Sequence, residues 1–364
     1  MSERLKQRLL DRIREGGPIT FAAFMEAALY DEEDGFYARP PIGERGHFVT
    51  SPHVSPAFGD LLARQLAQCW ELLGRPEPFT VVELGAGDGT LAGHVRSAAT
   101  AVPDLGLALR YVGVERTEGA RRALKEAGVE VADGLPERIT GCILANELLD
   151  NLPFHRLRNR DGRTVEVLVG AAGDTLVEME AEPTPEARAA LTSELRPGEE
   201  RPISPAALGL VREVAGALTR GHVLLFDYGF SASERPGPVH AYRGHEMVAD
   251  VLADPGSRDV TAAVDLAALA GEAGRAGLQV WGPVTQREAL LALGFRMWSS
   301  GVRTRQAEAE ARGDWRDANR LFAERSRAGL LIEEAELGGL RLLAFGSPGL
   351  DPPAAVLGDP DTGC

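Results

Sequence analysis

The chain has 364 residues, of which 44% are hydrophobic and 26% are charged, and its formal net charge is −15. This composition is typical of a globular protein long enough for one large domain with additions, or for two domains. Contact with nucleic-acid phosphates requires dense Lys and Arg, and no uncharged apolar run approaches the roughly 18 residues that span a bilayer, so we expect neither a nucleic-acid partner nor stable membrane insertion.

Residues 1–75 predict a helical N-terminal cap. Helices are expected over residues 2–13, 20–29 and 57–73. The first has apolar side chains at Leu5, Leu9 and Ile13, which is the spacing of an amphipathic helix rather than of a signal peptide, so we expect a cytoplasmic protein. The Gly- and Pro-rich stretch 35–56 is either a lid over a cofactor or a plain surface loop.

A glycine-rich turn follows the first predicted strand. Residues 80–84 lead into Gly85, Gly87 and Gly89, after which a helix is predicted. Glycine lets the backbone approach a ligand closely, and the helix offers its unpaired N–H groups there. The third glycine of a dinucleotide fingerprint is missing, because Thr90 holds that position. The turn therefore predicts a nucleotide-like cofactor other than a dinucleotide, although a tight loop without a ligand is the alternative.

Two acids beside this turn indicate which cofactor it holds. Glu83 lies at the end of the strand, where a carboxylate would repel a phosphate but attract a cation. S-adenosyl-L-methionine carries a sulfonium and an ammonium group. We therefore expect Glu83 and Asp88 to hold the methionine end of this cofactor.

The next two predicted strands also end in acids. Glu115 follows the strand at 109–114 and is expected beside the first glycine turn, where its carboxylate can accept from both ribose hydroxyls. Asp133 follows the strand at 129–132 and is a candidate acceptor for the adenine amino group. The alternatives are a solvated residue at a helix N-terminus for Glu115 and a simple turn at Asp133.

The fourth strand, at 141–145, runs into Asn146, Glu147 and Asp150. The carboxyl end of this strand is expected to face the reacting group beside the cofactor. Buried carboxylates are costly unless they meet a cation or a hydrogen-bond donor, so this group predicts a positively charged or hydrogen-bonding substrate. A helix cap by Asn146 with solvated acids behind it is the alternative.

Strands and helices alternate over much of the chain, which predicts an α/β fold with a parallel sheet covered on both faces. The expected divisions are a cap and lid at 1–75, a cofactor-binding domain at 76–346 with a hairpin insertion at 154–200 and a helical layer at 284–330, and a disordered tail at 347–364.

Neither the arginines nor the cysteines predict a further site. The arginines at 156–163 alternate along the predicted hairpin, as on one solvated strand face. Cys69, Cys142 and Cys364 are far apart without a C-x-x-C pair, and the histidines lack ligand spacing, so no metal is expected.

Several segments, in chain order, carry a resemblance to a known family: 18–25, 28–31, 35–37, 48–52, 83–91, 145–147 with Asp150, 227–229 and 259–265. They resemble the MidA family of S-adenosylmethionine-dependent methyltransferases, which includes the mitochondrial complex I assembly factor. The resemblance implies a Rossmann-like class I methyltransferase core with a seven-stranded sheet and a helical N-terminal extension. It also implies methyl transfer to an arginine guanidinium in a partner protein.

The expected chemistry agrees with the acids at the fourth strand. A protonated guanidinium is a poor nucleophile, so carboxylates must orient it and localise its charge. Glu147 and Asp150, with Asn146, are the expected catalytic residues. Weaker candidates for closing the pocket are Thr50, Ser51 and His53. Two other functions stay open: methylation of a small molecule, and a cofactor-binding assembly factor with little activity.

Overall fold

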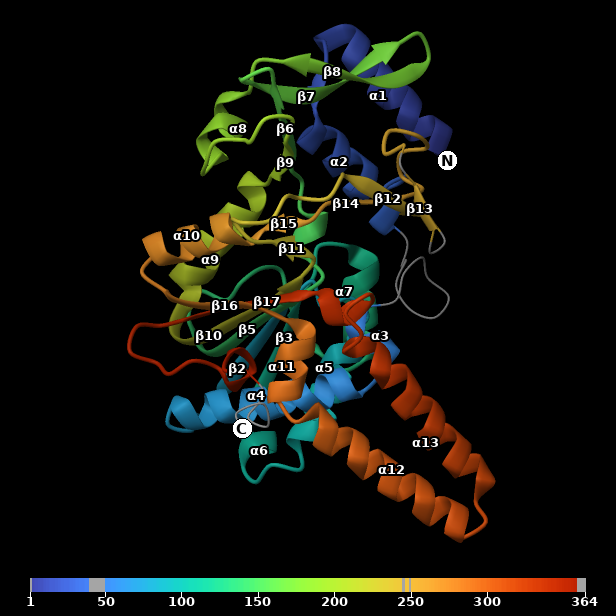
Figure 1. Cartoon of the computed structure of the whole chain (residues 1–364), viewed down its shortest axis with the longest axis vertical. Helices are drawn as coiled ribbons and strands as arrows, with labels where there is room; N and C mark the ends of the chain where they lie inside the picture. The colour runs from blue at the N-terminus through green and yellow to red at the C-terminus, as the bar shows by residue number, and fades with distance from the viewer. Residues whose placement is uncertain (1, 39–49, 244–245, 249, 359–364) are drawn as a thin grey trace.

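The structure is a computed structural model that describes residues 2–38, 50–243, 246–248 and 250–358 (Figure 1). Its centre is a seven-stranded sheet in the order β16-β17-β10-β5-β2-β3-β4. The strands are β2 (Phe79–Leu84), β3 (Leu109–Val114), β4 (Glu130–Ala132), β5 (Ile139–Asn146), β10 (Leu218–Asp227), β16 (Gln279–Thr285) and β17 (Arg341–Gly346). β17 runs antiparallel to β10 and β16, while the pairs from β10 to β4 are parallel. The predicted seven-stranded α/β sheet is confirmed.

Helices cover both faces of this sheet because its strands are apolar on both sides. In β2, Val81 belongs to the core under α4 (Ala57–Leu72) and α5 (Thr90–Ala99), whereas its neighbour Val82 belongs to the core under α9 (Pro205–Ala217) and α10 (Leu266–Arg275). Successive side chains of a strand point to opposite faces, so one short strand contributes to two cores. Two short helices, α6 (Leu105–Ala108) and α7 (Glu118–Glu126), flank β3.

The predicted hairpin insertion is part of a larger second sheet. The sheet consists of β1 (Ile19–Thr20), β6 (His155–Arg160), β7 (Arg163–Ala172), β8 (Thr175–Ala181) and β9 (Glu200–Ile203). Its own core includes apolar side chains of α1 (Ser2–Gly16) and α2 (Phe21–Tyr30), which lie beside it in Figure 1. The prediction of one cap at 1–75 was therefore incomplete, because α1, β1 and α2 pack on the inserted sheet while α4 packs on the main sheet.

The arginine row of β6 is paired rather than solvated. Arg156 is only 6% exposed and forms ion pairs with Glu178 of β8 and Glu200 of β9. Arg158 pairs with Glu178, Glu180 and Glu200. The expectation of a solvated strand face was wrong for these two arginines, because acids of β8 and β9 form ion pairs with them.

The smaller elements complete the chain. They are α3 (Ser51–Val54), α8 (Pro185–Ala190), β11 (Gly229–Phe230), β12 (His240–Arg243), β13 (Glu246–Val248), β14 (Asp259–Thr261), β15 (Val264–Asp265) and α11 (Gln286–Ala292). The predicted helical layer contains a long pair, α12 (Phe295–Ala311) and α13 (Trp315–Ala328), which projects from the body of the molecule in Figure 1. Within the described part of the chain, we find no helix with the length and apolar character needed to cross a bilayer.

The prediction of a disordered tail was wrong for residues 347–358. This segment forms a 3-10 turn at Ala354–Val356, and the side chains of Leu350 and Ala355 are buried against the main core. The backbone N–H groups of Ala354 and Ala355 donate to the side chains of Gln68 and Gln65 of α4. A composition rich in Pro, Gly and Asp conceals these two apolar contacts. The predicted lid at 35–56 lies partly outside the described residues.

Candidate functional site

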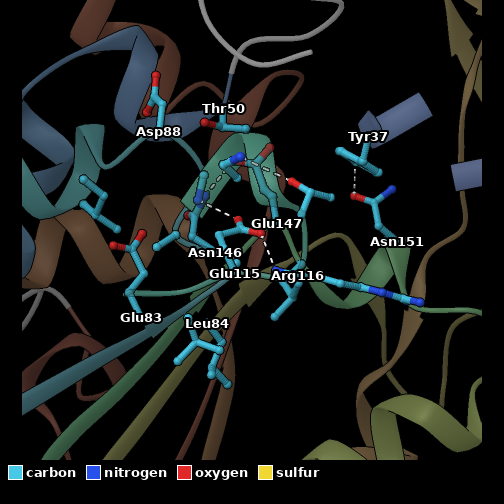
Figure 2. A pocket seen from close by; sticks show the side chains of 18 of the residues that line it. Tyr37, Thr50, Glu83, Leu84, Asp88, Glu115, Arg116, Asn146, Glu147 and Asn151 are labelled. Atoms are coloured by element: carbon cyan, nitrogen blue, oxygen red, sulfur yellow. Dashed lines mark hydrogen bonds between the residues drawn. The ribbon is translucent and has the colours of Figure 1, made fainter. Parts of the chain in front are cut away.

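A cavity of about 490 Å³ lies at the carboxyl ends of β2, β3 and β5 (Figure 2). Leu84 pairs with Val114 on one side and with Ala145 on the other, so the three strands end at the same level. The residues that follow them therefore line one space, as the sequence predicts. The predicted residues on its wall are Glu83, Gly85, Gly87, Asp88, Glu115, Asp133, Asn146 and Glu147. Gly89 and Asp150 are absent from the lining.

The glycine turn requires glycine for steric reasons. Gly85, Gly87 and Gly89 have φ values of 66°, 57° and 82°, in the left-handed region that favours glycine. A Cβ on Gly85 would lie 2.9 Å from Cδ1 of Leu148. The Gly87 N–H group donates to Oε1 of Glu115 at 2.7 Å, which ties the turn to the next strand.

Glu115 fixes the backbone at the edge of the cavity. Its second oxygen, Oε2, accepts from the N–H group of Arg116 at 3.0 Å. Burial raises the pKa of Glu115, and the two backbone N–H groups oppose this effect. Each carboxylate oxygen can accept a second hydrogen bond, so this placement is compatible with the predicted contact to ribose hydroxyls. That role stays a prediction.

Glu83 is a buried acid with one partner among the described residues. Only 4% of it is exposed, and the Tyr111 hydroxyl donates to its Oε2 at 2.7 Å. Burial raises the pKa of Glu83 to about 8, an effect that the Tyr111 hydrogen bond only partly offsets. A cation in the cavity would favour the ionised form and lower this pKa. Its predicted role at the methionine end fits this environment and is untested.

Asp88 connects the glycine turn to the N-terminal part of the chain. Its Oδ2 lies 3.0 Å from Nε2 of His53, whose Nδ1 lies 2.9 Å from the Thr50 hydroxyl, and its Oδ1 accepts from the Thr90 N–H group at 3.0 Å. Burial opposes ionisation of Asp88, but the hydrogen bonds from His53 and Thr90 outweigh it and lower the pKa to about 2. Thr50 and His53 line the cavity, and their role in closing it stays a prediction.

Asp133 lies at the outer part of the cavity wall. Its side chain is 95% exposed and forms an ion pair with Arg121 at 3.0 Å. Arg121 also donates from Nε to the backbone oxygen of Glu115 at 2.7 Å, which holds the ion pair beside the end of β3. The predicted contact of Asp133 with adenine is untested, and the carboxylate already has a cationic partner.

Glu147 and Asn146 form the polar end of the cavity. Glu147 has a φ of 51°, an uncommon conformation for a non-glycine residue. Its Oε1 accepts from the Ser51 N–H group and from Nδ2 of Asn146, both at 3.0 Å. Among the described residues, Oε2 of Glu147 has no hydrogen-bond partner in the structure, and neither has the buried Oδ1 of Asn146. Burial raises the pKa of Glu147 to about 7.

Asp150 does not reach the cavity. Its Oδ2 accepts from the Thr261 hydroxyl at 2.7 Å, and its Oδ1 is buried without a partner in the part of the chain that is described. It belongs to an acidic cluster with Asp227 and Asp259, and burial raises the pKa of all three carboxyls. The prediction that Asp150 faces the reacting group beside Glu147 therefore differs from the structure, which places Asp150 behind the wall.

Asp227 explains how the segment after β5 is held. Its Oδ2 accepts from the backbone N–H groups of Leu148 at 3.1 Å and Leu149 at 2.6 Å. These bonds fix the sharp turn that follows Glu147. The sequence reasoning noted Asp227 only within a resembling motif, because nothing local to β10 indicates a contact with the end of β5.

An aromatic wall from the N-terminal region was missed. The rings of Tyr30 and Tyr37 stack with centroids 5.5 Å apart, and their hydroxyls donate to the backbone and side-chain oxygens of Asn151, both at 3.0 Å. The Arg116 guanidinium lies 4.2 Å from the centroid of the Tyr30 ring. All four residues line the cavity. Their placement depends on how α2 packs against the inserted sheet, and no sequence pattern shows that packing.

Residues 61–284 match the model of a family described as "Putative S-adenosyl-L-methionine-dependent methyltransferase". A Drosophila melanogaster relative named "Protein arginine methyltransferase NDUFAF7 homolog, mitochondrial" is 30% identical over 303 residues, which are 72% of this chain and 68% of the relative. The Homo sapiens protein arginine methyltransferase NDUFAF7 is 28% identical over 329 residues, 79% of this chain and 73% of that protein.

Solved structures show the same similarity. A crystal structure of a Burkholderia thailandensis protein bound to S-adenosyl-homocysteine has a TM-score of 0.84 and 28% identity, and the match covers 99% of this chain and 96% of the other. A second structure from the same organism has a TM-score of 0.83 and 29% identity, with the same coverage.

Proposed function

Because the chain belongs to the MidA family of S-adenosyl-L-methionine-dependent methyltransferases, we propose that it transfers the methyl group to an arginine guanidinium of a partner protein. Relatives named as protein arginine methyltransferases support this acceptor. The observation that carries the proposal is the polar end of the cavity, where Oε2 of Glu147 and Oδ1 of Asn146 have no partner among the described residues.

The residues of the cavity fit the cofactor. When bound, S-adenosyl-L-methionine supplies a methyl group on a sulfonium that acts as the leaving group. Glu83 offers a carboxyl whose pKa of about 8 would fall beside a positive charge. The glycine turn has positive φ values that favour glycine, and Glu115 keeps acceptor capacity toward hydroxyl groups.

The polar end suits a planar cation. A guanidinium presents five N–H donors in a fixed geometry and no acceptor. The hydrogen bonds from Ser51 and Asn146 hold Oε1 of Glu147, so Oε2 is left to accept from one guanidinium nitrogen. Asn146 supports this acceptor through its Nδ2 group, because its own Oδ1 is buried. An acceptor fixed in this way would orient the guanidinium and draw its positive charge away from the attacking nitrogen, and such positioning supplies much of the rate in a methyl transfer.

The proposal is tested by incubating the purified protein with methyl-labelled cofactor and a dialysed extract of its own host. We expect label on arginine, located by mass spectrometry of the labelled proteins. Cofactor binding without any labelled protein would count against the proposal. Label confined to low-mass compounds in an undialysed extract would favour a small-molecule acceptor.

A further inference from the structure

Two cysteines and a histidine meet in the core, away from the cavity. They are Cys69 of α4, Cys142 of β5 and His222 of β10, and one potential ligand atom of each lies within 4.8 Å of the other two. All three residues are buried, with exposures of 0%. The sequence reasoning predicted no metal site because these residues are far apart in the chain, and the fold removes that reason.

The strand register explains the cluster. β5 and β10 are parallel neighbours, and Cys142 stands directly opposite His222. Residues two positions apart share a face of a strand, and Leu144 and Leu224 belong to the core on the α4 side. Cys142 and His222 therefore face α4, which contributes Cys69 from above.

The hydrogen bonding of His222 is that of a metal-ligating histidine. Its Nε2 lies 2.9 Å from the backbone oxygen of Asp351, and because a carbonyl oxygen only accepts, Nε2 must carry the proton. The lone pair is then on Nδ1, which is buried and has no hydrogen-bond partner in the described structure. A ligating histidine typically donates its other N–H group to a carbonyl or carboxylate in this way.

The surroundings of Cys69 would stabilise a thiolate. Nε2 of Gln65 donates to its sulfur at 3.3 Å. Buried cysteines often serve only as small apolar side chains, and that explanation would account for Cys69 and Cys142 alone. It leaves Nδ1 of His222 with no better partner than the sulfur of Cys69, a weak hydrogen-bonding group, although buried polar groups are nearly always paired.

We propose that Cys69, Cys142 and His222 bind one zinc ion. Zinc bonds of about 2.3 Å to sulfur and 2.0 Å to nitrogen place the ligand atoms about 3.5–4 Å apart, which is within the observed spacing. Two thiolates neutralise a divalent ion, and this balance matters in a dry core where net charge is costly. The three side chains leave the fourth position of a tetrahedral ion to a small ligand such as water.

The site would be structural. Cys142 precedes Asn146 by four residues along β5, so the cluster is about 13 Å from the cavity, toward the amino ends of the strands. The ion would join α4 to β5 and β10, and through His222 it would hold the segment that contains Asp351. Binding releases the remaining thiol protons to solvent, at most two per ion, and involves no oxidation or reduction.

The test uses the full-length protein purified without chelator, with its metal content measured by mass spectrometry. We expect about one zinc per chain. Protein stripped of metal should bind Co²⁺ with a thiolate-to-metal charge-transfer band, and a hundredfold excess of Zn²⁺ over its dissociation constant should raise the thermal midpoint by about 4 °C.

Variants identify the ligands. Cys69→Ser and His222→Ala should lose the bound zinc and the Co²⁺ band, while Cys364→Ser, which removes the third cysteine, should keep both. If the first two variants do not fold, the charge-transfer band of the unmodified protein still decides whether thiolates bind. Absence of bound zinc together with absence of the Co²⁺ band would overturn the proposal.

Discussion

Replacing Glu147 by Gln separates the charge at the polar end of the cavity from its geometry. The amide oxygen of Gln can still accept from the Ser51 N–H group and from Asn146, so the turn after β5 should keep its structure. The second position changes from an acceptor to an N–H donor, which would face a guanidinium with the wrong polarity. A lost hydrogen bond to a charged group is worth up to about 3 kcal/mol, so we expect kcat/KM for the protein acceptor to fall about 100-fold.

The Glu147→Gln variant should lose activity but gain stability above pH 4.5. Burial raises the pKa of Glu147 from 4.5 to about 7, so the folded protein holds this proton more tightly than the unfolded chain does. The free energy of unfolding therefore falls as pH rises from about 4.5 to 7, by roughly 3 kcal/mol for this group. Gln does not ionise. The variant should be as stable as the unmodified protein below pH 4.5 and more stable at pH 8.

The assay measures methyl transfer and urea unfolding across pH 5–9, with cofactor affinity determined by calorimetry. Activity of the unmodified enzyme should fall about tenfold per pH unit below 7, because the protonated carboxyl cannot orient a cation, whereas the residual activity of the variant should lack this step. Glu118→Gln, at an exposed position on α7, is the matched control and should leave all three measurements unchanged. Full activity of Glu147→Gln at pH 8 would refute the assigned role.

Three further predictions concern the turn, the acidic cluster and the tail. Gly85→Ala should weaken cofactor binding at least tenfold in calorimetry, because its φ of 66° and the contact of a Cβ with Leu148 both oppose alanine, whereas Gly93→Ala on α5, with nothing near its Cβ, should bind normally. Asp227→Ala should lower the free energy of unfolding by about 3 kcal/mol in urea, since it leaves buried N–H groups unpaired. An unchanged midpoint would refute this. Deleting residues 348–364 should cost about 3 kcal/mol in thermal unfolding through lost apolar burial, and a fully stable truncated chain would contradict the described packing.

Features that depend on adjacent residues could be predicted from the sequence. The glycine turn, its helix and the acids at the strand ends follow from the order of residues along the chain, and parallel strands that end at one level bring Glu115 and Asn146 to the same cavity. Contacts between distant segments could not be predicted. The sequence places Asp150 near Glu147, yet in the fold its carboxyl lies in a cluster with Asp227 and Asp259, which belong to other strands.

The placement of the cavity tyrosines and of the cysteine–histidine cluster was not predicted, and the reason is the same for both. Tyr37 reaches the cavity because α2 packs on the inserted sheet, and no pattern within residues 1–75 indicates that contact. Cys69 and His222 meet because α4 covers the face of the sheet on which β5 and β10 align. Neither of these long-range contacts is marked by a periodic pattern or a residue spacing in the sequence.

The electrostatics of the cavity favour cations as ligands. Burial raises the pKa of Glu83, Glu115 and Glu147, and repulsion between Glu147 and Asp150 of the acidic cluster acts in the same direction on Glu147. A bound phosphate would face these carboxyls at close range, whereas a sulfonium or a guanidinium would stabilise their ionised forms. Binding of either cation should then release protons near pH 7. The buffer dependence of the calorimetric enthalpy would reveal that release, and a release of no protons would show that the acids are already ionised in the free protein.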